Sequence, residues 1–130
     1  MIVVGYTADQ YGRAALDHAV AEAKLRGTGL LVINSTAGDS YSDARFARSG
    51  EIEDLQTSLA SSGVDFEVRQ PVGVDAAEEL LGAMDRPEAD LLVIGIRHRS
   101  PVGKLLLGSV SQQLILECPK PVLTVKPPED

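Results

Sequence analysis

The sequence predicts an α/β protein with an open five-stranded parallel sheet and helices on both faces, a Rossmann-like arrangement. Short apolar segments alternate with amphipathic helical segments along the whole chain. This alternation is typical of parallel strands joined by helical crossovers. Three apolar segments are continuous, as strands buried on both faces are, whereas two others alternate apolar with polar residues, as edge strands do.

The continuous segments are residues 2–5, 30–33 and 91–94, and the alternating segments are residues 64–69 and 122–126. We expect the first, second and fourth strands at the centre of the sheet, and the third and fifth at its edges. Right-handed crossovers then favour the strand order 3-2-1-4-5.

Two helices are predicted in the first half of the chain, at residues 11–26 and 45–61. Gly27 and Gly63 follow them and are expected to end them, because glycine readily adopts the left-handed conformation of a C-cap. Their buried stripes are expected to consist of Ala15, Leu16, Ala19, Val20 and Ala23, and of Ile52, Leu55 and Leu59.

Two shorter helices are predicted in the second half. Asp75 opens the third helix, and Glu78 three residues later gives it the spacing of a capping box, before Pro87 interrupts it. The fourth helix should begin near Ser109 and end before Pro119. Their inward-facing residues are expected to be Ala77, Leu80, Leu81 and Met84, and Val110, Leu114 and Ile115.

The composition restricts the class of protein. A chain of 130 residues suits one domain, residues 1–130, with an aliphatic core, since 44% of it is hydrophobic and only 4% aromatic. The net charge of −7 argues against nucleic-acid binding, which needs a basic face. A single cysteine, Cys118, excludes an internal disulfide. With no signal peptide and no apolar run near the ~18 residues that span a membrane, we expect a cytoplasmic protein.

The predicted strand order places a ligand site at one end of the sheet. The order reverses between the first and fourth strands, and ligands of such sheets bind at the carboxyl ends of the strands beside the reversal. The loops there are residues 5–11 and 95–109. The second loop ends in Gly108-Ser109, where a helix is expected to begin. Free amides at a helix start attract a phosphate, so the sequence predicts an anion site there.

These residues resemble the universal stress protein family. The family motif is a glycine, two residues, a second glycine, nine residues, and then Gly-Ser or Gly-Thr. This chain has Gly95, two residues, His98, nine residues and Gly108-Ser109. Residues 105–111 and the terminal run 119–126 are also similar to that family. The resemblance implies an adenine nucleotide alpha hydrolase-like fold, and ATP binding in those members that bind it.

Two residues depart from the ATP-binding members of the family. His98 replaces the second glycine of the motif. Its ring is expected either to take space that a phosphate would use or, when protonated, to donate to the phosphate, so we expect weaker nucleotide binding rather than none. Thr7 stands where those members place an aspartate near the sugar, and Asp9 replaces it only if the loop bends differently. By resemblance, Ser35 and Ile94 flank the adenine. The candidate nucleotide-binding residues are Gly5, Thr7, Asp9, Ser35, Ile94, Gly95, Arg97, His98, Gly108, Ser109, Val110 and Ser111.

Each of these features also has a structural interpretation. Gly5 and Gly95 suit the ends of strands, and Ser109 suits a helix cap whose hydroxyl satisfies a backbone amide. The basic residues between the strand and the helix either bind phosphate or are simply solvated. They are Arg97, Arg99 and Lys104.

No catalytic centre is identified. Gly103-Lys104 lacks the other residues of a Walker A motif, since His98 and Leu105 stand where glycine and Ser or Thr are required. Two histidines and one cysteine, widely separated, do not form a zinc site. We therefore expect at most slow ATP hydrolysis.

The last strand indicates self-association. An apolar edge strand left bare invites pairing, and the resemblance implies a homodimer through Val122, Leu123, Thr124, Val125 and Lys126. Two functions remain open. The first is a dimeric stress-response regulator that binds ATP or a related adenine nucleotide, together with Mg²⁺ or Mn²⁺. The second is a stress protein that binds no nucleotide and acts through protein contacts.

Overall fold

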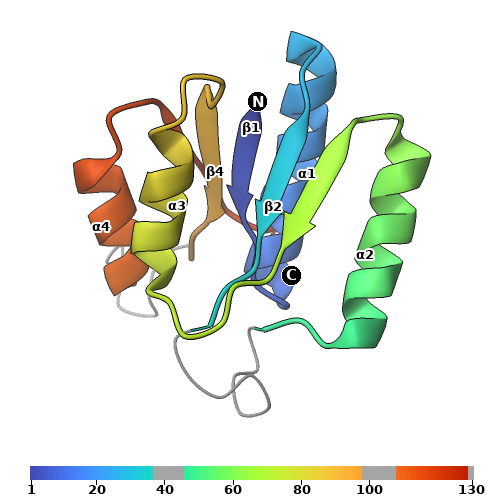
Figure 1. Cartoon of the computed structure of the whole chain (residues 1–130), viewed down its shortest axis with the longest axis horizontal. Helices are drawn as coiled ribbons and strands as arrows, with labels where there is room; N and C mark the ends of the chain where they lie inside the picture. The colour runs from blue at the N-terminus through green and yellow to red at the C-terminus, as the bar shows by residue number, and fades with distance from the viewer. Residues whose placement is uncertain (37–45, 98–107, 129–130) are drawn as a thin grey trace.

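The structure is a three-layer α/β sandwich, with the sheet between two pairs of helices (Figure 1). The computed structural model describes residues 1–36, 46–97 and 108–128. The sheet has five strands in the order β3-β2-β1-β4-β5, and every neighbouring pair is parallel. The predicted fold class and strand order are therefore confirmed.

The elements alternate along the chain. The strands are β1 (Ile2–Gly5), β2 (Leu30–Ile33), β3 (Phe66–Arg69), β4 (Leu91–Gly95) and β5 (Val122–Val125). The helices are α1 (Gln10–Arg26), α2 (Ser49–Ser62), α3 (Ala76–Met84) and α4 (Ser109–Glu117).

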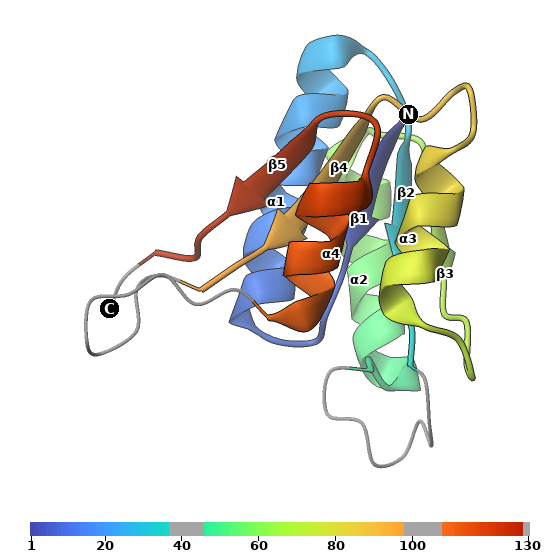
Figure 2. The ribbon, with the colours of Figure 1, turned by 90° about the vertical axis from the view of Figure 1, so that its left-hand side faces the viewer.

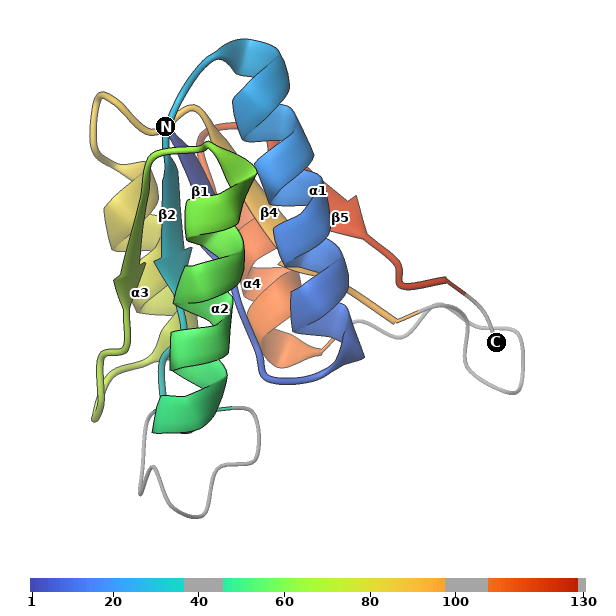
Figure 3. The ribbon, with the colours of Figure 1, turned by 90° about the vertical axis from the view of Figure 1, so that its right-hand side faces the viewer.

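The core lies on both faces of the sheet. Helices α3 and α4 cover one face (Figure 2), and α1 and α2 cover the other (Figure 3). Successive side chains of a strand point to opposite faces, so Val4 packs under α1 and α2 while Val3 packs under α3 and α4. This double burial is why β1, β2 and β4 are apolar at nearly every position.

Several element boundaries differ from the predicted ones, and three of these differences have a clear physical reason. Helix α2 begins at Ser49 rather than at residue 45, because Ala47 donates its amide to the side chain of Asn34 and Arg48 is extended. β3 begins at Phe66, two residues later than expected, after the left-handed turn at Gly63. β5 ends at Val125, since the prolines that follow Lys126 have no amide for a sheet.

The buried stripes of the helices are largely those predicted, with one clear error on α4. Leu114 is buried and Val110 packs against the core, but Ile115 is 40% exposed and its neighbour Leu116 is 83% exposed. Successive residues of an α-helix are rotated by about 100° around its axis. When Leu114 faces the core, Ile115 therefore points away from it. The expectation that Ile115 faces inward was wrong.

Candidate functional site

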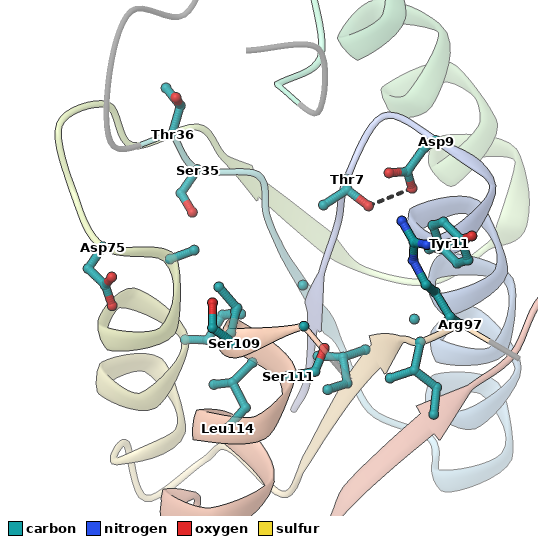
Figure 4. Close-up of a pocket in the computed structure, with 18 residues that line it drawn as sticks. Thr7, Asp9, Tyr11, Ser35, Thr36, Asp75, Arg97, Ser109, Ser111 and Leu114 are labelled. Carbon is teal, nitrogen blue, oxygen red and sulfur yellow. Dashed lines mark hydrogen bonds between the residues drawn. The ribbon is translucent and has the colours of Figure 1, made fainter. Parts of the chain in front are cut away.

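A cavity of about 470 Å³ opens at the carboxyl ends of β1 and β4, where the strand order reverses (Figure 4). Its volume lies within the range of small-molecule sites. The predicted residues that line it are Gly5, Thr7, Asp9, Ser35, Ile94, Gly95, Arg97, Gly108, Ser109, Val110 and Ser111. His98, Arg99 and Lys104 lie outside the described residues.

Seven further residues that sequence reasoning missed also line the cavity. They are Tyr11, Thr36, Asp75, Ala76, Leu80, Ile96 and Leu114. The sequence could have indicated Asp75 as a lining residue, because its capping pattern marks the start of a helix that follows an edge strand. In a parallel sheet that helix starts at the same end as the ligand loops.

Three helices present their N-termini to the cavity, and only one of them lacks a side-chain cap. Asp9 caps α1 by accepting from the amide of Gly12 at 3.0 Å, and Asp75 caps α3 by accepting from the amide of Glu78 at 3.0 Å. α4 starts after Gly108, with no side-chain cap hydrogen bond. The interpretation of Ser109 as a cap was therefore wrong, because the capping position is Gly108.

The uncapped helix start has a chemical consequence. The first-turn amides of α4, from Ser109 to Ser111, have no acceptor within the described residues. These N–H groups carry the positive end of the helix dipole, and two serine hydroxyls stand beside them. The α4 start is therefore the part of the cavity wall best suited to an anion.

The opposite part of the wall accepts hydrogen bonds. Thr7 donates its hydroxyl to Asp9 Oδ1 at 2.7 Å, and the amide of Gly12 donates to the same oxygen. Because the only proton of the Thr7 hydroxyl is used in this bond, its oxygen can act toward a ligand only as an acceptor. Figure 4 shows this pair across the cavity from Ser109.

Two glycines hold the loop after β1 and the end of β4 close to α1. A Cβ at Gly12 would collide with the backbone of Thr7, and a Cβ at Gly95 would collide with the backbone of Tyr11. Gly95 thus has a packing role whatever binds nearby. Gly5 is less constrained, because an added Cβ would meet side chains rather than backbone, those of Leu80 at 3.0 Å and of Ile94 at 3.4 Å.

A buried asparagine supports the third side of the cavity. Asn34, 1% exposed, donates to the carbonyl of Tyr6 at 2.8 Å and accepts from the amide of Ala47 at 2.7 Å. Gln70 donates to Asn34 Oδ1 at 3.0 Å and to the Ala47 carbonyl at 2.8 Å. Asn34 therefore ties the ends of β1, β2 and β3 to the residues that enter α2, just before Ser35 reaches the cavity.

Tyr6 lies behind the cavity, in the core cluster under α1 and α2. Burial raises the pKa of Tyr6, an effect that the charge of Arg13 opposes and that Glu51 and Asp9 reinforce. The phenol is therefore held neutral just behind the loop that carries Thr7.

Part of the lining is apolar. Leu80, Ile94 and Leu114 give the cavity an apolar floor between the starts of α3 and α4. Within residues 1–36, 46–97 and 108–128, no group of three or more His, Cys, Asp or Glu side chains could hold a metal ion. None of the helices in this same part of the chain has the length and apolarity needed to cross a membrane.

The fold and the cavity define a doubly wound α/β protein with a ligand-sized site at its switch point. The chain belongs to the universal stress protein family, whose model matches residues 1–126. It is 74% identical over 127 residues to a universal stress protein of Mycolicibacterium smegmatis, covering 98% of each chain. A solved universal stress protein from Archaeoglobus fulgidus is 30% identical, with a TM-score of 0.78 and coverage of 96% of this chain and 97% of that one.

Two more distant structures share the fold and were solved with nucleotides. One is a universal stress protein from Archaeoglobus fulgidus in complex with dAMP, 24% identical, with a TM-score of 0.63 and coverage of 96% of both chains. The other is a universal stress protein in complex with cAMP, 23% identical, with a TM-score of 0.70 and coverage of 95% of this chain and 94% of that one.

Proposed function

We propose that this protein is a stress-response regulator that binds ATP or a related adenine nucleotide in the switch-point cavity. The observation that carries the proposal is the uncapped start of α4, whose amides face the cavity beside Ser109 and Ser111. The dAMP and cAMP complexes of two proteins with this fold support the same ligand class.

In this proposal the phosphates, the sugar and the adenine each contact a part of the cavity lining with complementary chemistry. The phosphates lie at the α4 start, and a divalent cation such as Mg²⁺ or Mn²⁺ accompanies them, held chiefly by the nucleotide. Sugar hydroxyls donate to Thr7 and Asp9, which present acceptors. The adenine lies over the apolar floor, between Ser35 and Ile94.

Isothermal titration calorimetry with MgATP, AMP and cAMP tests the proposal. The parent protein should bind at least one of them, and Ser109→Ala should bind that nucleotide more weakly, by roughly the two- to tenfold that one hydrogen bond contributes. If the parent gives no heat with any of the three while His98→Gly binds one of them, this chain is not a nucleotide binder and His98 is the reason.

We also propose that the protein is a homodimer through β5. Among the described residues this strand pairs only with β4, and no other strand pairs with its outer edge. The carbonyl of Pro121 accepts from the amide of Leu92 in β4 at 3.1 Å, and that of Val125 accepts from the amide of Ile96, just after β4, at 2.8 Å. Because the polar groups of successive strand residues point to alternate sides, the N–H and C=O of Thr124 point to the free edge.

Thr124→Pro tests the dimer without touching the β4 pairing. Proline removes the outward amide while an edge strand tolerates it, so sedimentation velocity should give a monomer for Thr124→Pro and a dimer for the parent and for Thr124→Val. A monomeric parent protein would refute the dimer.

A function through protein contacts remains the second candidate. It is favoured by the exposed apolar side chains of Ile115 and Leu116 on the outer side of α4. Leu116→Lys should leave nucleotide affinity unchanged, and it should reduce cellular stress resistance if this second function holds.

A further inference from the structure

Arg97 is held at the mouth of the cavity by the structure around it. It follows β4 directly, and two contacts fix the chain just before it. The Cα of Gly95 packs against the backbone of Tyr11, and the amide of Ile96 donates to the carbonyl of Val125 at 2.8 Å. The backbone that carries Arg97 is therefore anchored to both α1 and β5.

The side chain of Arg97 lies against an aromatic ring. Its guanidinium carbon is 6.0 Å from the ring centroid of Tyr11, at the limit of a cation–π contact. Figure 4 shows Arg97 running across Tyr11 toward Thr7 and Asp9, on the side of the cavity away from Asp75. No carboxylate within the described ranges pairs with this guanidinium, so its charge there is not neutralised.

We propose that Tyr11 is a positioning residue that holds Arg97 ready to neutralise the outer phosphates of a nucleotide. This inference rests on the proposed nucleotide site and assigns the recognition of phosphate charge to it. The α4 start meets the phosphates through neutral amides, and Arg97 adds a full positive charge for the outer ones. A long side chain loses entropy when it is fixed by a ligand, and the Tyr11 ring removes part of that loss in advance.

The inference predicts that the effect of Arg97 grows with the number of phosphates. Arg97→Gln should lower MgATP affinity about tenfold, as expected for the loss of a charge-assisted hydrogen bond, and should change adenosine affinity by less than about twofold. Tyr11→Leu should lower MgATP affinity about two- to fivefold, the size of an exposed cation–π contact. Tyr11→Phe keeps the ring and should bind MgATP like the parent protein.

A double-variant cycle distinguishes positioning from direct contact between Tyr11 and the ligand. If Tyr11 acts through Arg97, Tyr11→Leu combined with Arg97→Gln binds MgATP no more weakly than Arg97→Gln alone. If Tyr11 touches the nucleotide itself, the two losses multiply and the adenosine affinity also falls. Arg26→Gln is the matched control, since it removes the same charge at the far end of α1.

Calorimetry with adenosine, AMP and MgATP on these variants, at two salt concentrations, tests the role of Arg97 and Tyr11 separately from nucleotide binding itself. Arg97→Gln should also show a weaker salt dependence of MgATP binding than the parent. MgATP binding that Arg97→Gln or Tyr11→Leu leaves unchanged overturns this inference while the nucleotide site stands. A parent protein that binds none of the three ligands overturns the proposed function and this inference together.

Discussion

The hydroxyl of Thr7 donates a 2.7 Å hydrogen bond to Asp9 Oδ1, the same oxygen that caps α1. One carboxylate thus orders the loop after β1 and the helix that follows it. It also fixes the direction in which the threonine oxygen can interact with a ligand.

Replacing Asp9 should weaken the fold as the loss of a helix cap does. We expect Asp9→Ala to lower the free energy of unfolding by about 1 to 2 kcal/mol, because the amide of Gly12 and the hydroxyl of Thr7 lose their shared acceptor. Asp9→Asn keeps an oxygen at the same place and should lose well under 1 kcal/mol. Urea denaturation measures both, and equal losses from the two variants would contradict the capping role.

A cap supplied at α4 should stabilise the protein and block its ligand. Gly108 has φ −64° and ψ 160°, a backbone conformation open to any residue, and a Cβ there meets no atom of the described residues within 4 Å. Gly108→Asp should stabilise the fold by about 0.5 kcal/mol, because its carboxylate accepts from the free amides.

The same carboxylate should lower MgATP affinity more than tenfold, since it takes the amides and repels phosphate. Gly50→Asp is the control, because it adds an equal charge in the first turn of α2, which does not line the cavity. Thermal denaturation and calorimetry check the pair. MgATP binding by Gly108→Asp at parental affinity would remove the α4 start from the proposed site.

The Asn34 network should be one of the most sensitive positions for stability. Asn34→Leu leaves the carbonyl of Tyr6 and the amide of Ala47 buried without their partner, so we expect a loss of about 3 kcal/mol in urea denaturation. Ser35→Ala next to it should lose less than about 0.5 kcal/mol. An Asn34→Leu protein as stable as the parent would show that water or a rearranged Gln70 replaces the asparagine.

Stability should fall at alkaline pH through Tyr6. Because burial raises the pKa of Tyr6, the folded protein binds the phenolic proton more tightly than the unfolded chain, whose tyrosine pKa is about 10. This stabilising contribution is complete below pH 10 and is lost as the pH rises through the folded-state value.

Unfolding free energies of the parent and of Tyr6→Phe, measured from pH 8 to pH 11, test this dependence. The parent should lose more stability over the range than Tyr6→Phe, and Tyr11→Phe controls for removing a phenol at the cavity mouth. Parallel curves for the parent and Tyr6→Phe would mean that Tyr6 ionises equally well in both states.

The sheet could be predicted because a strand that is buried on both faces has apolar residues at consecutive positions. β1, β2 and β4 are apolar at consecutive positions, whereas β3 exposes Glu67, and this contrast alone separates the centre from the edge. The exposure of Ile115 was not predictable in the same way. On a short helix the buried line depends on how α4 leans against α3, which no local pattern encodes.

The cavity was partly predictable for the same reason. The switch point follows from strand order, and the glycines mark loops there, so its position could be predicted. The bonds of Asn34 join residues 28, 13 and 36 positions away, and such partners have no local signature. The contact between Arg97 and Tyr11 likewise depends on α1 and β4 meeting in space.

Because Gly95 has no side chain, β4 and the first turn of α1 pack closely against each other at this position. A methyl group there would wedge the first turn of the helix outward, since it would collide with the Tyr11 backbone. Tyr11, Thr7 and Asp9 all sit on the part of the chain that would move. The width of the cavity mouth therefore depends on the absence of a side chain at Gly95, on β4.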